Sequence, residues 1–382
     1  MNSRVTLDKL PLAKKSKFIP ANQLRTWRGS LAETGGTLAV VTGTFALLHP
    51  GNLTAIREAA RQASHVALIV HPDGSTTADS SSATAEGAGQ PSAAVRLELA
   101  EHLRAVSAVS TCALARAEET LEQWRPFTLV HCLKQNSGDA ITTSARRLAS
   151  RVVDIAPIAG CFTADIQKAI RNRQTPVAVP EAALAPQPTL HDLEQFLNSD
   201  TGGRPACNAM RSIAGRPLVT VNGCFDILHL GHARLLALAR ARGARLLVLV
   251  NDDDSVRRYK GAGHPVFPIR FRLLALNALE AVSYTYPFAG DNPLELLALI
   301  KPDIHIKGGS FEETRVEDER RLVESWGGRL EIVPLVPGFS SSAIVGRMAQ
   351  TQRPTTDDRR QTSDEENVTG QLLGGGQPEV YH

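Results

Sequence analysis

Two histidines on either side of a glycine are the residues of this sequence best placed to do chemistry. His229 and His232 lie three residues apart, between an apolar segment (217–221) that predicts a strand and a helical pattern (233–242). The start of a helix after a strand offers unpaired N–H groups and a partial positive charge, which suit phosphate. Gly231 would allow a nucleotide to approach the backbone closely. Two imidazoles on one face of this helix start favour a polyphosphate whose charge rises during reaction, over two ordinary surface histidines.

Three further polar segments follow predicted strands in the same half of the chain. Asp252 and Lys260 follow the apolar run 245–250, Lys307 precedes two glycines, and a serine triplet begins at Ser340. The carboxyl ends of parallel strands share one edge of a sheet, so we expect these segments to meet there. The lysines would bring positive charge, and the serines would bring hydroxyls and helix-start N–H groups for terminal phosphates.

Each of these segments also has a purely structural interpretation. Ser340 or Ser341 could be a helix N-cap, and Lys307 with its glycines could form an ordinary turn. Residues 252–254 could form a solvated loop, or cap a helix through Asp254. Their shared place at one predicted sheet edge favours the phosphate site.

The chain contains two copies of one sequence pattern. His49 precedes its counterpart His229 by 180 residues, and Pro126 precedes Pro302 by 176. Arg96 corresponds to Arg272 in the same way. Each copy alternates predicted strands and helices, which is typical of a parallel sheet. The sequence therefore predicts an α/β fold with two Rossmann-like domains, each built on a parallel sheet.

Composition shifts divide the chain further. We expect a first domain at 20–175, a linker and leading helix at 176–214, a second domain at 215–350 and a disordered tail at 351–382. Within these, the Pro- and Ala-rich segment 180–188 predicts the linker, residues 189–197 a short helix, and 73–93 a mobile insertion.

Bulk composition excludes several classes of protein. The 382 residues include 42 Lys and Arg against 39 Asp and Glu, a net charge of +3, which is too small to indicate a nucleic-acid or membrane partner. No apolar run has the length of a transmembrane helix, and residues 1–17 lack the apolar core of a signal peptide. Five cysteines without C-x-x-C spacing support neither a disulfide framework nor a metal site. We expect a cytoplasmic protein.

Four motifs in the second half of the chain carry a resemblance to a known family. The motifs are Asn222-Gly-Cys-Phe-Asp-Ile-Leu-His-Leu-Gly-His, Val250-Asn-Asp-Asp-Asp-Ser-Val-Arg-Arg-Tyr-Lys-Gly, Lys301-Pro-Asp-Ile-His-Ile-Lys-Gly-Gly and Val336-Pro-Gly-Phe-Ser-Ser-Ser-Ala-Ile-Val. From about Leu218 to Met348 the chain resembles the cytidylyltransferase-like nucleotidyltransferase superfamily, which is marked by a His-x-Gly-His turn. Within it, the chain is most similar to the adenylyltransferase domain of ADP-heptose synthase, which acts on a heptose 1-phosphate.

The resemblance implies a role for each matching residue. His229 and His232 would contact the nucleotide phosphates during catalysis, with Lys307 as a third contributor. The residues implied in nucleotide binding are Asn222, Gly223, Cys224, Phe225, Asp226, Gly231, Gly308, Ser340, Ser341 and Ser342. Lys260, Arg272 and Asp252 fall on positions that contact phosphate or substrate.

The second copy departs from the family pattern at a few positions. His264 and Phe267 stand where the family usually has Arg and Asn, and Ser310 stands where it has Asp. The serine triplet replaces Ser-Thr-Thr or Ser-Thr-Ser and keeps the hydroxyls. These changes bear on the acceptor substrate more than on nucleotide binding.

The first copy has lost most of the polar groups. Ala46 stands in place of Asp226, Asn52 in place of His232 and His131 in place of Lys307, while Phe162-Thr-Ala replaces the serine triplet. We therefore expect a structural or regulatory first domain without catalysis. Ethanolamine-phosphate cytidylyltransferases provide a similar tandem architecture.

These observations predict transfer of a nucleotidyl group from a nucleoside triphosphate to a sugar phosphate, with release of pyrophosphate. The acceptor phosphate is ionised near neutral pH, so positioning and charge stabilisation would suffice. We expect Mg²⁺ to bind with ATP, or with CTP, without a dedicated protein metal site.

Other functions remain open from the sequence. A cytidylyltransferase could act on glycerol 3-phosphate or ethanolamine phosphate, and a non-catalytic protein could bind a nucleotide without turnover. A dehydrogenase is disfavoured because no G-x-G-x-x-G follows either first strand. A separate sugar kinase would make the acceptor, and a homodimer is left open.

Overall fold

The computed structural model describes residues 16–71, 91–112, 116–132, 147–198, 217–309, 313–334 and 339–350. The expected tail (351–382), Ser310 and most of the expected insertion (73–93) lie outside the described residues. The last residue of that insertion, Ala93, begins a helix.

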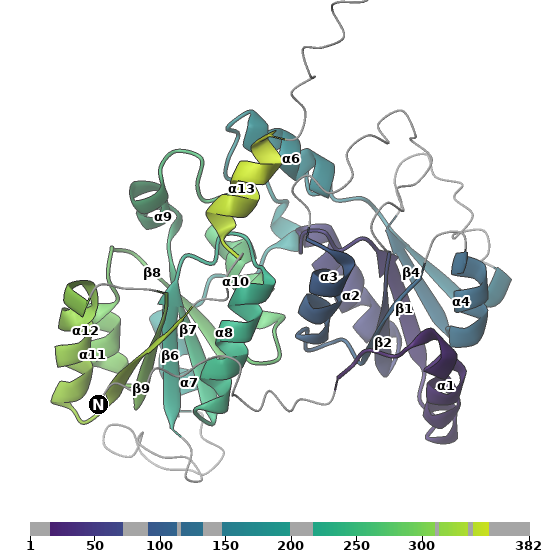
Figure 1. Cartoon of the computed structure of the whole chain (residues 1–382), viewed down its shortest axis with the longest axis horizontal. Helices are drawn as coiled ribbons and strands as arrows, with labels where there is room; N and C mark the ends of the chain where they lie inside the picture. The colour runs from purple at the N-terminus through teal and green to yellow at the C-terminus, as the bar shows by residue number, and fades with distance from the viewer. Residues whose placement is uncertain are drawn as a thin grey trace, which may run out of the picture.

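The described chain forms two five-stranded parallel sheets, which confirms the predicted α/β class (Figure 1). The first has the order β3-β2-β1-β4-β5, with β1 Leu38–Gly43, β2 His65–Val70, β3 Ala108–Thr111, β4 Thr128–Cys132 and β5 Arg151–Ile155. The second has the order β10-β9-β6-β7-β8, with β6 Leu218–Gly223, β7 Arg245–Asn251, β8 Tyr284–Phe288, β9 Ile304–Gly308 and β10 Arg329–Val333. The central strands are almost wholly apolar because both faces of each sheet are covered.

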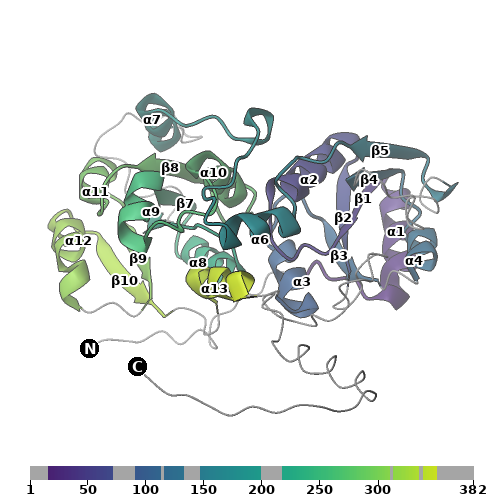
Figure 2. The same ribbon diagram turned by 90° about the horizontal axis from the view of Figure 1, so that it is seen from above.

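Helices cover the two faces of each sheet. Those of the first half are α1 Leu24–Glu33, α2 Pro50–Gln62, α3 Ala93–Glu101, α4 Ala117–Trp124 and α6 Thr163–Arg171. Those that follow are α7 Leu190–Asn198, α8 Leu230–Ala241, α9 Asp253–Lys260, α10 Ile269–Asn277, α11 Leu294–Ile300, α12 Glu313–Ser325 and α13 Ser341–Gln350. Helix α7 corresponds to the helix predicted at 189–197. Figure 2 shows the two α/β units side by side, with α6 and α13 packed together between them.

The two copies repeat one another in strand register as well as in sequence. Leu38 pairs with His65 in the first sheet, and Leu218, which lies 180 residues later, pairs with Arg245. The backbone after the first strand of each sheet is repeated too, because Phe45 and Phe225 both have a positive φ, 50° and 46°. Such a φ is uncommon for a bulky side chain and marks a turn determined by its surroundings. The duplication predicted from sequence is therefore present down to single backbone angles.

The two domains meet through equivalent surfaces. Leu103 and Leu279, which are counterparts, form an antiparallel bridge. Around it Arg104 N donates to Ala278 O at 2.8 Å, and Glu280 N donates to His102 O at 2.9 Å. Each of these bonds is the counterpart of the other, as in the isologous interface of a two-fold dimer. The two copies are thus related by an approximate two-fold axis within one chain.

Hydrophobic packing follows the same arrangement. The facing sides of the two sheets share one continuous hydrophobic core with α2, α8 and α10. The other side of the first sheet forms a separate core with α1 and α4. The other side of the second sheet forms a third core with α7, α11 and α12. Arg234 on α8 also donates two hydrogen bonds to Glu98 on α3, at 2.6 and 2.7 Å. The expected linker is held against the second domain as well, since Arg270 donates to Ala185 O and to Glu181.

Candidate functional site

The His-x-Gly-His turn connects β6 to α8 at the carboxyl edge of the second sheet. His229 is the N-cap of α8, and its Nδ1 accepts a hydrogen bond from the backbone N–H of His232 at 3.3 Å. The two rings stack with centroids 3.6 Å apart and planes 17° from parallel. The structure therefore brings both imidazoles together at a helix N-terminus, where the N–H groups and the helix dipole favour an anion.

Burial makes both imidazoles neutral near pH 7. It lowers the pKa of His229 to about 4, with the charge of Lys260 adding to the effect. It also lowers the pKa of His232 well below its usual value, with the nearby His229 ring and the Lys260 ammonium adding to the effect and the Ile227 carbonyl opposing it. The Nδ1 atom of His232 is buried and has no hydrogen-bond partner within the described part of the chain. Such atoms are rare in folded proteins, and this one lies in the turn at which phosphate is expected.

The space next to Gly231 is occupied by the chain itself. A side chain added at Gly231 would place its Cβ 2.8 Å from the Cβ of Phe339 and 3.1 Å from Nδ1 of His229. The Phe339 ring lies over the His229 ring, with centroids 6.2 Å apart. Phe339 therefore covers the glycine that was expected to give a nucleotide close access to the backbone.

The serine triplet begins α13 beside this turn. Ser340 caps the helix, because its Oγ accepts from the N–H of Ala343 at 3.4 Å, which is the structural role that the sequence left open. Ser341 is buried and donates to the carbonyl of Ile227 at 3.3 Å, so it ties α13 to the His turn. Ser342 is exposed.

Lys307 is a buried member of an ion pair. Its Nζ donates to Asn222 Oδ1 at 2.9 Å and to Glu319 Oε1 at 2.9 Å. The carboxylate of Glu319, from α12, neutralises the lysine charge at the sheet edge. Sequence reasoning missed Glu319, because a single acidic residue on a charged helix carries no motif.

Asp226, for which the resemblance implied a nucleotide contact, makes its hydrogen bonds to neighbouring protein groups in this structure. Its side chain is completely buried, and it accepts hydrogen bonds from His264 Nδ1 at 2.6 Å, Val266 N at 2.6 Å and Phe267 N at 3.3 Å. These bonds fasten the loop 264–267 to the His turn. His264 and Phe267, which the sequence marked as departures from the family, are thus direct partners of Asp226.

Arg272 was expected to contact phosphate or substrate, and in this structure its hydrogen bonds are made within the protein. Its side chain is fully buried, and it donates to the carbonyls of Phe267, Cys224 and Asn251 and to the carboxylate of Asp253. Arg96 makes the corresponding bonds to carbonyls in the first domain. Because the domain that lost its polar groups keeps this arginine, its role is to hold the ends of the strands.

Asp252 is likewise structural in this conformation. It is the N-cap of α9, and its Oδ1 accepts from the N–H of Ser255 at 2.7 Å. The sequence had named Asp254 as the alternative cap, which is wrong by two residues. Lys260 ends the same helix, and its charge helps to lower the pKa of His229 and His232. Burial raises the pKa of the Cys224 thiol, and the charge of Lys260 opposes that rise.

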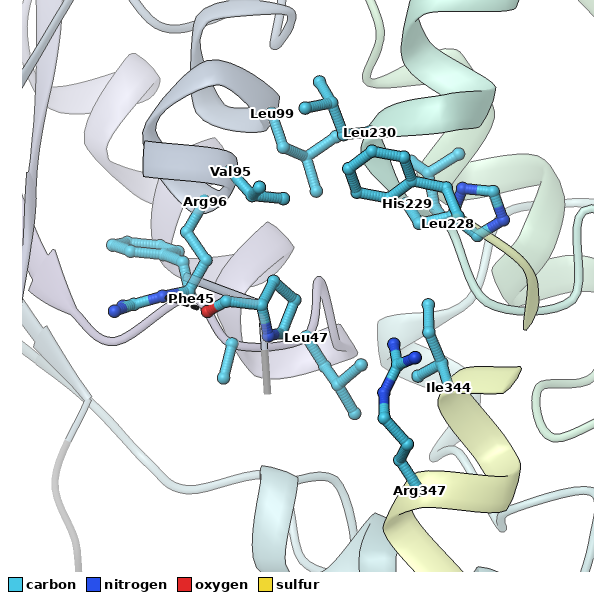
Figure 3. A pocket seen from close by; sticks show the side chains of 13 residues that line it. Phe45, Leu47, Val95, Arg96, Leu99, Leu228, His229, Leu230, Ile344 and Arg347 are labelled. Carbon is cyan, nitrogen blue, oxygen red and sulfur yellow. Dashed lines mark hydrogen bonds between the residues drawn. The ribbon is translucent and has the colours of Figure 1, made fainter. Parts of the chain in front are cut away.

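A cavity of about 170 Å³ lies between the two domains, behind the His turn (Figure 3). One wall comes from the first domain, with Phe45, Leu47 and Arg96, and the other from the second, with His229 and Ile344. The lining is mostly apolar, with Arg347 of α13 at its edge. The first domain therefore forms part of the immediate surroundings of the turn.

The equivalent turn of the first domain has become an ordinary helix cap. His49 Nδ1 accepts from Asn52 N, and Asn52 Oδ1 accepts from His49 N, both at 3.4 Å. This reciprocal pair satisfies two N–H groups at the start of α2. Asn52 thus replaces the second imidazole with a residue whose side chain serves the helix.

Among the described residues, no group of three or more His, Cys, Asp or Glu side chains is placed to hold a metal ion. The described helices are also all too short or too polar to cross a membrane.

A parallel α/β sheet whose first strand leads into a His-x-Gly-His turn at a helix start defines the second domain as one of the nucleotidyltransferase type. Residues 220–347 match the family model described as cytidylyltransferase-like. This part of the chain is a cytidylyltransferase-like domain.

Known proteins resemble the same region. The bifunctional protein HldE of Alkalilimnicola ehrlichii is 42% identical over 134 residues, which is 35% of this chain and 28% of that protein. HldE of Methylococcus capsulatus is 45% identical over 132 residues, which is also 35% of this chain and 28% of that protein. HldE of Halorhodospira halophila is 40% identical over 149 residues, 39% of this chain and 31% of that protein. The chain spans less than a third of the length of these curated relatives.

Among solved structures, a lipopolysaccharide core biosynthesis protein from Thermoplasma volcanium is 27% identical, with a TM-score of 0.28. The match covers 32% of this chain and 98% of that one.

Proposed function

We propose that the second domain transfers an adenylyl group from ATP to a sugar phosphate such as heptose 1-phosphate, with release of pyrophosphate. The observation that carries the proposal is the stacked pair His229 and His232 at the N-terminus of α8, with a buried unpartnered Nδ1 on His232. The similarity of this region to HldE proteins, at 40–45% identity, supports the choice of a heptose phosphate.

The reaction requires placement more than acid or base. An oxygen of the acceptor phosphate attacks the α-phosphorus of the nucleotide, and the bond from that phosphorus to the oxygen that bridges to the β-phosphate breaks. The acceptor is already ionised, so no proton has to be removed. Because burial keeps both imidazoles neutral, His229 and His232 would act as N–H donors to phosphate oxygens as negative charge accumulates.

The side chains at the turn suit phosphate oxygens better than a metal ion. Imidazole N–H groups, serine hydroxyls and the Lys260 ammonium are donors, while the buried carboxylate of Asp226 is already occupied. We propose that Mg²⁺ would be held by the nucleotide phosphates and water, as this ion prefers. It would neutralise the charge that develops on the leaving pyrophosphate.

The proposal is tested by pyrophosphate release from ATP or CTP with heptose 1-phosphate, glycerol 3-phosphate or ethanolamine phosphate. We expect turnover with ATP and the heptose. His232→Ala should lower kcat by about 10²–10³-fold, as the loss of one transition-state donor does. The matched control is Asn52→Ala, the same position in the first domain, which should leave turnover unchanged. Undiminished pyrophosphate release by His232→Ala would refute the assignment.

A second candidate is a cytidylyltransferase that acts on a polyol or amino-alcohol phosphate. The family model matched by residues 220–347 favours it by its description, and His264 stands where an arginine is usual. Turnover with CTP alone would establish this alternative, and nucleotide binding without any turnover would indicate a non-catalytic protein.

A further inference from the structure

A chain of buried polar side chains lies beneath the carboxyl edge of the second sheet. Thr220 Oγ1 and His305 Nδ1 are 2.8 Å apart, and both side chains come from the middle of adjacent strands. His305 Nε2 lies 3.4 Å from Glu319 Oε2. Glu319 in turn pairs with Lys307, whose Nζ also donates to Asn222. The network thus runs from the sheet interior to the residue that precedes the turn at Gly223.

The network contains one ion pair and one neutral ring. Burial lowers the pKa of His305, so its imidazole is uncharged near pH 7. Burial alone would raise the pKa of Glu319, but the close approach of His305 and the charge of Lys307 outweigh it, and the pKa is lowered. Glu319 is therefore ionised and faces the ammonium of Lys307 at 2.8 Å.

The first domain provides an internal control for this network. Val40 and Leu129 occupy the strand positions of Thr220 and His305, and both are fully buried. The strand registers at these positions are the same in the two sheets. The fold therefore forms with apolar residues there, and a buried ion pair adds little stability compared with apolar packing. A function of the site accounts for the network better than the fold does.

We propose that Glu319 is a positioning residue for nucleotidyl transfer, holding the Lys307 ammonium and, through it, the Asn222 side chain at the edge of the sheet next to the His turn. This inference rests on the function proposed above. Asn222 and Lys307 lie on neighbouring strands, β6 and β9, so one ammonium can hold both the carboxylate and the amide. The His305 ring, which Thr220 holds at 2.8 Å, lies against the carboxylate with Nε2 at 3.4 Å from Oε2. Lys307 then acts as a directed donor whose charge is balanced.

The test is steady-state kinetics of Glu319→Gln in the full chain, with the acceptor that gives turnover. A displacement of about 1 Å at a reacting group can cost about 10²-fold, and we expect a fall of that order in kcat with little change in KM for the nucleotide. Glu319→Asp keeps the charge and should recover part of kcat. Glu324→Gln is the matched control, because Glu324 lies on the same helix in an exposed pair with Arg320.

A double variant separates positioning from folding. Thr220→Val with His305→Leu installs the residues of the first domain, and replacing both partners by apolar groups can be neutral or stabilising. We expect an unchanged or higher Tm together with a reduced kcat. Wild-type kcat in Glu319→Gln, or a Tm that falls in step with kcat in all variants, would overturn the inference. Absence of turnover in the wild-type protein would overturn the proposed function itself, and this inference with it.

Discussion

Two buried histidines at equivalent positions should make the protein sensitive to acid. His49 and His229 cap α2 and α8, and burial lowers the pKa of each to about 4 from 6.5. Between about pH 4 and pH 6.5, each ring is therefore protonated in the unfolded chain but neutral in the folded chain. The stability that each neutral ring contributes is therefore complete above about pH 6.5, declines as the pH falls below that value, and is fully lost below about pH 4.

The size of the effect follows from these pKa values. A pKa lowered from 6.5 to about 4 corresponds to about 3 kcal/mol per ring, at about 1.4 kcal/mol for each pH unit. At pH 5 the unfolded ring is almost fully protonated and the folded ring is almost fully neutral. The loss of unfolding free energy between pH 7 and pH 5 is then about 2 kcal/mol for each ring.

Urea unfolding at pH 7, 6 and 5 measures this loss. His49→Asn and His229→Asn keep an oxygen that can cap the helix but remove the titrating ring. Each variant should lose about 2 kcal/mol less than wild type between pH 7 and pH 5. His191→Asn, at an exposed histidine on α7, is the control and should follow wild type. A pH dependence in His49→Asn and His229→Asn identical to that of wild type would show that neither ring is buried and neutral.

Two further substitutions test the surroundings of the turn. Asp226→Ala installs the residue of the first domain and leaves two buried N–H groups and His264 without an acceptor. The free energy of unfolding in urea should fall by about 3 kcal/mol or more. A fall below about 1 kcal/mol would contradict the role of Asp226 in fastening the loop 264–267. Gly231→Ala places a Cβ 2.8 Å from Phe339 Cβ, whereas at Gly51 the nearest atoms belong to the His49 ring at 3.1 Å. Gly231→Ala should therefore cost about 1–3 kcal/mol and Gly51→Ala clearly less, and equal urea midpoints would contradict the contact with Phe339.

Much of the fold was predictable because its signals are local and repeated. Each central strand is a short apolar run, and the nearly constant spacing between the two copies predicted both sheets before any contact was known. The His turn was predictable for a similar reason, since a strand, a glycine turn and a helix start are adjacent in sequence. The register and the positive φ at Phe45 and Phe225 confirm the duplication with independent geometry.

The roles of individual polar residues were less predictable. Asp226, Asp252 and Arg272 have side chains that a nucleotide site can use, but the same donors and acceptors also satisfy backbone groups. Sequence alone cannot separate these uses when the partner is a carbonyl or an N–H that any residue carries. For Arg272 a signal was present, because Arg96 remains in the domain that lost its other polar groups.

Comparison of the two domains separates what the fold needs from what a ligand needs. The first domain keeps His49 as a helix cap and Arg96 as a brace for carbonyls, so these positions are explained by folding. At the position of His232 it has Asn52, which completes a capping pair. In the second domain the same position holds a partly exposed imidazole whose Nδ1 atom is buried and unpartnered among the described residues. Burying a polar atom without a partner costs free energy, and the fold does not require it here. A phosphate oxygen would supply the missing partner, which is why His232 distinguishes the domain that we expect to act on nucleotides.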